Sequence, residues 1–175
     1  MRKALYLMGV LNDTDVHWLA EKGTKSVFEA GSVLIHRGSP IQHLYIVLDG
    51  RLSVEVGNVT IATLLAGEVI GEISFVDSRP PLASVIAEVP SIVLGIEKSL
   101  LKKKLESDSH FGARFYRAIA FFLADRLRST TGRLGYTASA DGTEAEIDPD
   151  ELDADFMQVV SMANIRFDFL IRSLR

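Results

Sequence analysis

The residues best placed to do chemistry lie in the segment Gly71-Glu72-Ile73-Ser74 and in the pair Ala83-Ser84 that follows it. A glycine lets the backbone approach a ligand closely, and exposed amide groups at the start of a helix favour an anion. A Gly-Glu pair that opens a short helical turn, with a small hydroxyl residue returning beside it, predicts a cradle for a phosphate and a ribose.

Short strands must position this cradle, because turn residues interrupt the apolar runs throughout residues 24–97. Asp49-Gly50 and Gly57-Asn58 each stand between two apolar runs. Both dipeptides are typical of two-residue hairpins, since Gly and Asn tolerate positive φ. Many short strands at this spacing predict a β-sandwich or jelly roll, in which pairing two sheets protects the edges.

Helical patterns flank the strands on both sides. Residues 12–22 predict a short helix with polar cap residues at its start and Gly23 as its terminator. A longer helix is expected after the polar residues 107–109, because apolar side chains recur there every three or four residues. Its apolar stripe comprises Phe111, Phe115, Ala118, Ile119, Phe122, Leu123 and Leu127.

The C-terminal region is acidic, with nine Asp or Glu residues against three Arg in residues 136–175. Residues 136–149 have the composition of a flexible linker. Residues 150–175 open with a helix-start pattern and predict an amphipathic interaction helix with a heptad seam. The seam comprises Phe156, Val160, Ala163, Phe167, Leu170 and Leu174, with Val159 and Ile171 on the same side. This face either docks on the same chain or binds another chain, and the pattern leaves both open.

The composition indicates one good core and one appended element, in a chain of 175 residues with 47% hydrophobic content. The absence of cysteine excludes disulfides and thiolate metal sites and fits a reducing compartment. The apolar run in residues 1–11 is too short to span a bilayer and has no small-residue cleavage site. We therefore expect a packed N-terminal segment in a cytoplasmic protein without membrane insertion.

These features together resemble the cyclic-nucleotide-binding domain family, which serves the catabolite activator protein, protein kinase regulatory subunits and nucleotide-gated channels. The resemblance covers residues 1–135 and rests on the cassette GEISFVDSRPPLASV, the glycines before it and the closing long helix. It implies an α+β fold built on an eight-stranded jelly roll (a double-stranded β-helix). An N-terminal helix, a long C-terminal helix and an extra tethered amphipathic helix complete the expected architecture.

The resemblance also implies roles for the cassette residues. Glu72 matches the acid that accepts hydrogen bonds from the ribose 2′-hydroxyl, and Ser84 matches the residue that hydrogen-bonds a phosphate oxygen. Gly71, Ile73 and Ser74 match the backbone whose amides face the phosphate.

One position departs from the family pattern. Pro81 stands two residues before Ala83, where the family has the arginine that holds the cyclic phosphate. Proline offers neither a charge nor an amide donor. Losing such a contact should weaken binding by about 2–5 kcal/mol. Arg79 lies in the same loop and is the candidate replacement.

The resemblance implies a non-enzymatic regulatory or sensor module with no metal or other cofactor. Its ligand would be a cyclic nucleotide such as cyclic AMP, cyclic GMP or a cyclic dinucleotide. We expect a homodimer that signals through its C-terminal helices, to a protein partner or to a second copy through the helix at 156–174. The alternative is a scaffold or adaptor that keeps the fold and has lost nucleotide binding.

Nucleic acid is not an expected partner. The acidic C-terminal region disfavours phosphate contacts, which supply most of the affinity for nucleic acid. Residues 136–175 contain one amphipathic helix and no second helix that could enter a major groove.

Overall fold

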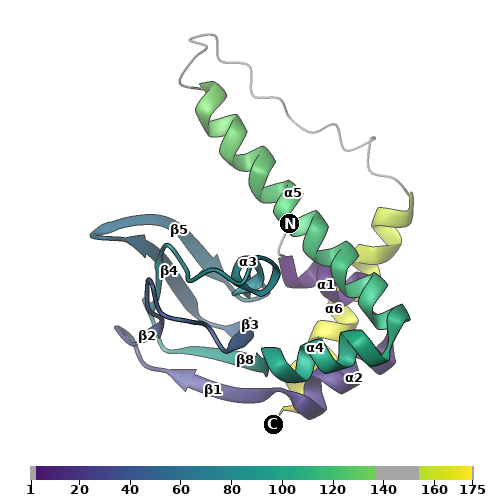
Figure 1. The fold of residues 1–175 in the computed structure, drawn as a ribbon. Helices are drawn as coiled ribbons and strands as arrows, with labels where there is room; N and C mark the ends of the chain where they lie inside the picture. The colour runs from purple at the N-terminus through teal and green to yellow at the C-terminus, as the bar shows by residue number, and fades with distance from the viewer. Residues whose placement is uncertain (1–2, 137–153, 175) are drawn as a thin grey trace.

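The computed structural model consists of two four-stranded antiparallel sheets beside a layer of helices (Figure 1). It describes the backbone of residues 3–136 and 154–174, and the side chains of residues 6–124, 127 and 162–174. The strands are β1 Thr24–Phe28, β2 Val33–Ile35, β3 His43–Asp49, β4 Arg51–Val56, β5 Val59–Leu65, β6 Val69–Ile70, β7 Ser84–Ala87 and β8 Ser91–Glu97. The helices are α1 Lys3–Val10, α2 Asp13–Lys22, α3 Glu72–Val76, α4 Lys98–Ser107, α5 Ser109–Tyr136 and α6 Ala154–Ser173. None of these helices, in the part that is described, is both long and apolar enough to cross a membrane.

The sheets confirm the predicted α+β class and the eight-stranded jelly roll. One sheet has the strand order β1-β8-β3-β6 and lies against the helices, while the other has the order β2-β7-β4-β5. The hairpin predicted at Gly57-Asn58 is confirmed, because β4 and β5 pair directly from Val56 and Val59 onward. The cassette helix α3 stands between β6 and β7, so it joins the two sheets.

The hairpin predicted at Asp49-Gly50 is wrong. β3 pairs with β6 and β8 in one sheet, whereas β4 pairs with β5 and β7 in the other, so the chain changes sheets at this turn. Gly50 has a φ of 100°, and a Cβ there would lie 2.3 Å from Ser91 Oγ. Gly50 is therefore required because its φ is positive and because Ser91 lies too close for a side chain. In the sequence, a glycine required for these reasons cannot be distinguished from a glycine in a two-residue hairpin.

The N-terminal segment is a packed helix, α1, followed by the predicted short helix, α2. Asn12 caps α2 in a capping box: its side chain accepts a hydrogen bond from the Asp15 N–H, and the Asp15 carboxylate accepts one from the Asn12 N–H. Asp15 is also buried, and Arg114 of α5 binds it through two hydrogen bonds of 2.6 and 3.0 Å. This bidentate pair fixes α2 against α5.

The long helix begins as predicted. The Asp108 carboxylate accepts a hydrogen bond of 2.9 Å from the Phe111 N–H, which caps the first turn. Most of the predicted apolar stripe is buried, and Leu123 also contacts the core. Leu127 is the exception, since this residue is 68% exposed. Figure 1 shows the C-terminal part of α5 projecting beyond the sheets.

The C-terminal helix α6 docks on the chain's own N-terminal helices. Ala163 and Leu170 are fully buried in the main core, and α6 contacts both α1 and α2. Arg166 donates hydrogen bonds to Asp13 at 2.7 Å and to the Met8 and Gly9 carbonyls at 3.1 and 3.2 Å, so it caps the end of α1. Of the two alternatives for the seam, the structure thus shows docking within one chain. The side chains of Phe156, Val159 and Val160, and all those of the predicted linker, lie outside the described side chains.

Candidate ligand-binding site

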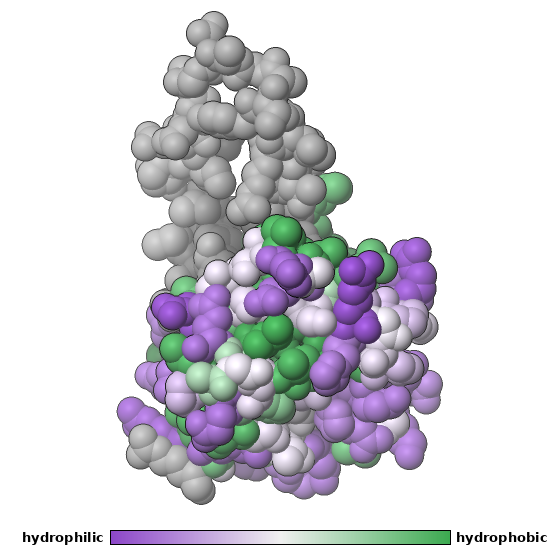
Figure 2. All heavy atoms as spheres, turned by 90° about the vertical axis from the view of Figure 1, so that its left-hand side faces the viewer, coloured by the Kyte–Doolittle hydropathy of each residue, from purple (hydrophilic) through white to green (hydrophobic). Residues whose placement is uncertain are grey.

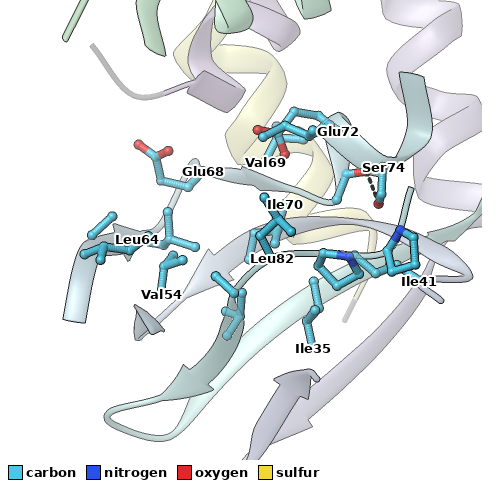
Figure 3. Close-up of a pocket in the computed structure, with 18 of the residues that line it drawn as sticks. Ile35, Ile41, Val54, Leu64, Glu68, Val69, Ile70, Glu72, Ser74 and Leu82 are labelled. Atoms are coloured by element: carbon cyan, nitrogen blue, oxygen red, sulfur yellow. Dashed lines mark hydrogen bonds between the residues drawn. The ribbon is translucent and has the colours of Figure 1, made fainter. Parts of the chain in front are cut away.

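A cavity of about 600 Å³ lies between the cassette and the sheet that contains β2, β7, β4 and β5 (Figure 3). This volume falls within the range of small-molecule sites. Most of its lining is aliphatic. The aliphatic and proline residues of the lining are Ile35, Ile41, Val54, Ile61, Ala62, Leu64, Val69, Ile70, Ile73, Pro80, Pro81, Leu82, Ala83 and Val85.

The cassette helix α3 forms one wall of the cavity. Gly71 precedes it with a φ of 90°, and a Cβ there would come within 3.0 Å of the His43 carbonyl. A side chain at this position would be strained, so the glycine fixes the direction in which α3 leaves β6. Gly71, Glu72, Ile73 and Ser74, four of the residues predicted to bind a ligand, all line the cavity.

Two carboxyl groups lie on the same side of the cavity. Figure 3 shows Glu68 and Glu72 together with Ser74 along one side, opposite Ile35 and Val54. Glu72 is buried and Glu68 is half-buried. Glu68 was not predicted as a site residue, although it stands beside Gly67 just before the apolar pair that forms β6. The cavity therefore has a polar side and an apolar side.

Ser74 connects the cassette to the start of α4. Its hydroxyl donates to the Gly71 carbonyl at 3.3 Å and accepts a hydrogen bond of 2.9 Å from Lys98 Nζ. Burial, and to a smaller extent the charge of Lys102, lower the pKa of Lys98. Lys98 lies 24 residues after Ser74, and no local pattern in the sequence indicates this contact.

Arg79 reaches the mouth of the cavity but is bound to an acid there. Its Nε lies 2.9 Å from Asp77 Oδ2, its backbone N–H donates to Asp77 Oδ1 at 3.0 Å, and its side chain is 81% exposed. Hydrogen bonds from the Arg79 backbone and side chain lower the pKa of Asp77. Both residues line the cavity.

The end of the cassette is tied to the connection between β2 and β3. The Gly38 N–H donates to the Pro81 carbonyl at 2.8 Å, and the Arg37 N–H donates to Ser84 Oγ at 3.1 Å. Ala83 and Pro81 line the cavity, whereas Ser84 does not. The structure thus brings six of the seven predicted site residues to one cavity and leaves the Ser84 hydroxyl outside it.

Apolar side chains also border the cavity on the surface. Ile61, Ile73 and Leu82 line it and are 48%, 43% and 82% exposed. Figure 2 shows the face that carries the free ends of the sheets, where apolar side chains gather at the centre among polar ones. On soluble proteins, exposed clusters of large apolar side chains such as leucine mark ligand-binding grooves or interaction surfaces.

The opposite side of α3 contacts the helical layer. Phe75 is buried, and its ring meets the ring of Phe115 edge-on, with a centroid distance of 5.7 Å and an interplanar angle of 76°. Sequence reasoning missed Phe75 as a functional residue. It stands in the sequence between the cavity-lining pair Ile73-Ser74 and the exposed Val76, which gives only a weak signal.

The described residues contain no group of three or more His, Asp or Glu side chains that could hold a metal ion. The cavity instead combines an aliphatic interior, a polar side on residues 68–74 and one arginine at its mouth. Such a site can enclose a small molecule and hydrogen-bond to it.

Comparison with known proteins points to one type of domain. The family model described as the cyclic nucleotide-binding domain matches residues 25–108. The cGMP-dependent protein kinase of Eimeria tenella is 29% identical over 83 residues, which are 47% of this chain and 8% of that protein. The voltage-gated inwardly rectifying potassium channel KCNH3 of Rattus norvegicus is 29% identical over 129 residues, which are 71% of this chain and 11% of the channel. The chain therefore spans a small fraction of these relatives.

Solved structures share the fold. A cyclic nucleotide-binding domain from Methylobacillus flagellatus superposes with a TM-score of 0.69 at 22% identity, over 83% of this chain and 85% of that one. The N-terminal domain of a transcriptional regulator from Streptomyces coelicolor gives a TM-score of 0.60 at 25% identity, over 74% and 91% of the two chains.

Proposed function

We propose that the protein is a regulatory sensor that binds a small molecule in the cavity beside α3, because residues 25–108 match the family model of the cyclic nucleotide-binding domain. The module is non-catalytic. Occupation of the cavity changes the position of α4 and α5, and these helices pass the change to a protein partner.

The observation that carries this proposal is the position of α3 between the cavity and the helices. Ile73 and Ser74 line the cavity, while Phe75 packs on Phe115 of α5. The helix has only five residues and is followed by an exposed loop, so a ligand can displace it more readily than a longer helix. A ligand that pushes or pulls on one side of α3 therefore moves the aromatic contact on the other side.

The hydrogen bond between Lys98 and Ser74 supplies a second connection, to the first residue of α4. Because Lys98 is partly desolvated, a change in the position of Ser74 alters both its hydrogen bond and its exposure to water. Helices α4 and α5 thus respond to the same movement at two points.

Thermal shift and amide hydrogen exchange on the full chain test this function. The probes are cyclic AMP, cyclic GMP and the neutral apolar dye N-phenyl-1-naphthylamine. A probe that raises the Tm should also change exchange in residues 109–124, and Glu72→Ala should reduce the Tm shift. Phe75→Leu should keep the Tm shift and reduce the exchange change in α5. A Tm shift without any effect on α5 contradicts the sensor mechanism.

A ligand-independent scaffold is the second candidate, and Pro81 together with the Arg79–Asp77 pair favours it. The scaffold predicts no Tm shift with any of the three probes.

Either function is compatible with a homodimer through α5. Exposed apolar side chains Tyr116, Ala120 and Leu127 lie on one face of this helix. Light scattering on the full chain and on Leu127→Glu tests the dimer, which the variant should weaken.

A further inference from the structure

We propose that the cavity beside α3 takes a mainly apolar, uncharged ligand that carries a hydroxyl or amino group, and that this ligand needs no phosphate. The inference rests on the proposed function, because it names the ligand class of the same cavity.

The groups that could hold a phosphate are missing or already bound. The Pro81 carbonyl accepts a hydrogen bond from the Gly38 N–H. Proline has neither a charge nor a backbone N–H that could bind a phosphate. Arg79 is the one cation among the described residues that line the cavity, and Asp77 holds its guanidinium. An anion entering here would have to displace Asp77 or share the guanidinium with it.

The hydroxyl expected to bind a phosphate oxygen is also engaged elsewhere. Ser84 Oγ accepts a hydrogen bond from the Arg37 N–H at 3.1 Å, and Ser84 does not line the cavity. This hydroxyl holds the end of the cassette to the preceding connection. It is therefore a structural contact in this chain.

The interior of the cavity favours a hydrocarbon or aromatic body. Its floor is formed by aliphatic side chains of the sheet, including Ile35, Val54, Leu64 and Val85. Apolar surface that a ligand buries there contributes favourably to the free energy of binding. The exposed Ile61 and Leu82 at the rim extend the apolar surface to the opening.

The polar side of the cavity favours hydrogen-bond donors on the ligand. Glu68 and Glu72 line this side, and a carboxylate can accept several hydrogen bonds, including ones from hydroxyl or amino groups of a ligand. A third acid, Asp77, lies at the mouth. Asp77 is paired with Arg79, so among the described lining residues no unpaired cation is available to an anion. The lining thus matches an apolar ligand with a donor group and disfavours an anion.

Fluorescence titration with N-phenyl-1-naphthylamine tests the apolar interior. The dye is neutral, largely aromatic, and carries one N–H. We expect saturable binding to the full chain, weakened at least tenfold by Val54→Phe, which fills the floor. Val56→Phe is the matched control, since Val56 lies on the same strand, is partly exposed and does not line the cavity. Equal binding to both variants would place the dye elsewhere and overturn the inference.

Displacement of the dye compares two ligands that differ by the phosphate. Cyclic AMP should displace it no better than adenosine, within about threefold. If cyclic AMP displaces the dye at least tenfold more effectively, the cavity recognises phosphate and the inference is wrong, while the sensor function stands. If no dye binds and no probe shifts the Tm, both proposals fail and the scaffold remains.

Discussion

The guanidinium of Arg79 is held by Asp77, two residues before it in the same exposed loop, with Nε 2.9 Å from Oδ2. Arg79 is the arginine closest in sequence to position 81, where the resembled family has its phosphate-binding arginine. The proline at residue 81 and the acid at residue 77 are therefore the two features that we propose weaken phosphate binding.

Restoring the arginine should restore affinity for the phosphate. Pro81→Arg is expected to tighten cyclic AMP binding, measured by calorimetry, by about 2–5 kcal/mol, which is roughly 30-fold to several thousand-fold. Pro81→Ala removes the proline ring without adding a charge and should give no gain. If Pro81→Arg binds cyclic AMP no better than Pro81→Ala, the missing arginine is not what limits phosphate binding.

Removing the partner of the buried Asp15 should destabilise the fold. Arg114→Met leaves a carboxylate that is 2% exposed without its bidentate partner, and we expect a loss of about 3–5 kcal/mol in urea unfolding. The double variant Asp15→Asn/Arg114→Met should recover part of that loss, because the unpaired charge is gone. A double variant less stable than Arg114→Met would contradict this explanation.

Arg166 should hold α6 in place mainly through the α1 carbonyls. Arg166→Met is expected to cost about 1.5–3 kcal/mol in urea unfolding, since it removes hydrogen bonds from a charged donor to Met8 and Gly9. Asp13→Asn should cost less than about 1 kcal/mol, because Asp13 is 82% exposed and solvent screens the pair. The control is Arg172→Met at an exposed position of the same helix, which should change the unfolding free energy little. If Asp13→Asn and Arg166→Met lose the same unfolding free energy, the stabilisation comes from the ion pair and not from the α1 carbonyls.

Phe115 should be among the most sensitive positions in the core. Its ring is fully buried between the rings of Phe75 and Phe111, so Phe115→Ala should cost about 3–5 kcal/mol through lost burial and the cavity left behind. The exposed Arg117, two residues along α5, should tolerate Arg117→Ala within about 0.5 kcal/mol. Comparable losses at both positions, in urea unfolding, would contradict the packing.

The N-cap of α5 should make stability depend on pH in the acid range. The Lys104 side chain, and then the Phe111 N–H, lower the pKa of Asp108 from 3.8 to about 2. The unfolded chain therefore binds the proton more readily, and this stabilisation is lost as the pH falls from about 4 to about 2. Asp108→Asn keeps a capping oxygen and should show a smaller decline of the urea midpoint over that window. An unchanged decline would exclude Asp108 as the cause.

The sequence predicted the elements well, because local chemistry determines them. The capping residue of α2, the cap of α5 and the Gly57-Asn58 hairpin each depend on residues close together in the chain. The Gly71-Glu72 pair likewise indicated the start of α3, the helix that forms one wall of the cavity.

The errors concern relationships between distant residues. Gly50 is required by Ser91, which lies 41 residues further along, so the sequence could not distinguish a change of sheet from a hairpin. The Ser84 hydroxyl is bound to Arg37, and Lys98 reaches Ser74, through contacts that only the folded arrangement creates. The aliphatic floor of the cavity comes from strands whose residues look like ordinary core.

The docking of α6 on α1 also affects how the chain folds. Arg166 and Met8 are separated by 158 positions, so this contact has a very high contact order and forms slowly. During synthesis, the buried side chains of α1 emerge from the ribosome long before α6 can cover them. During that interval the apolar side chains of α1 stay exposed, and exposed apolar surface of this kind promotes aggregation of an incomplete chain.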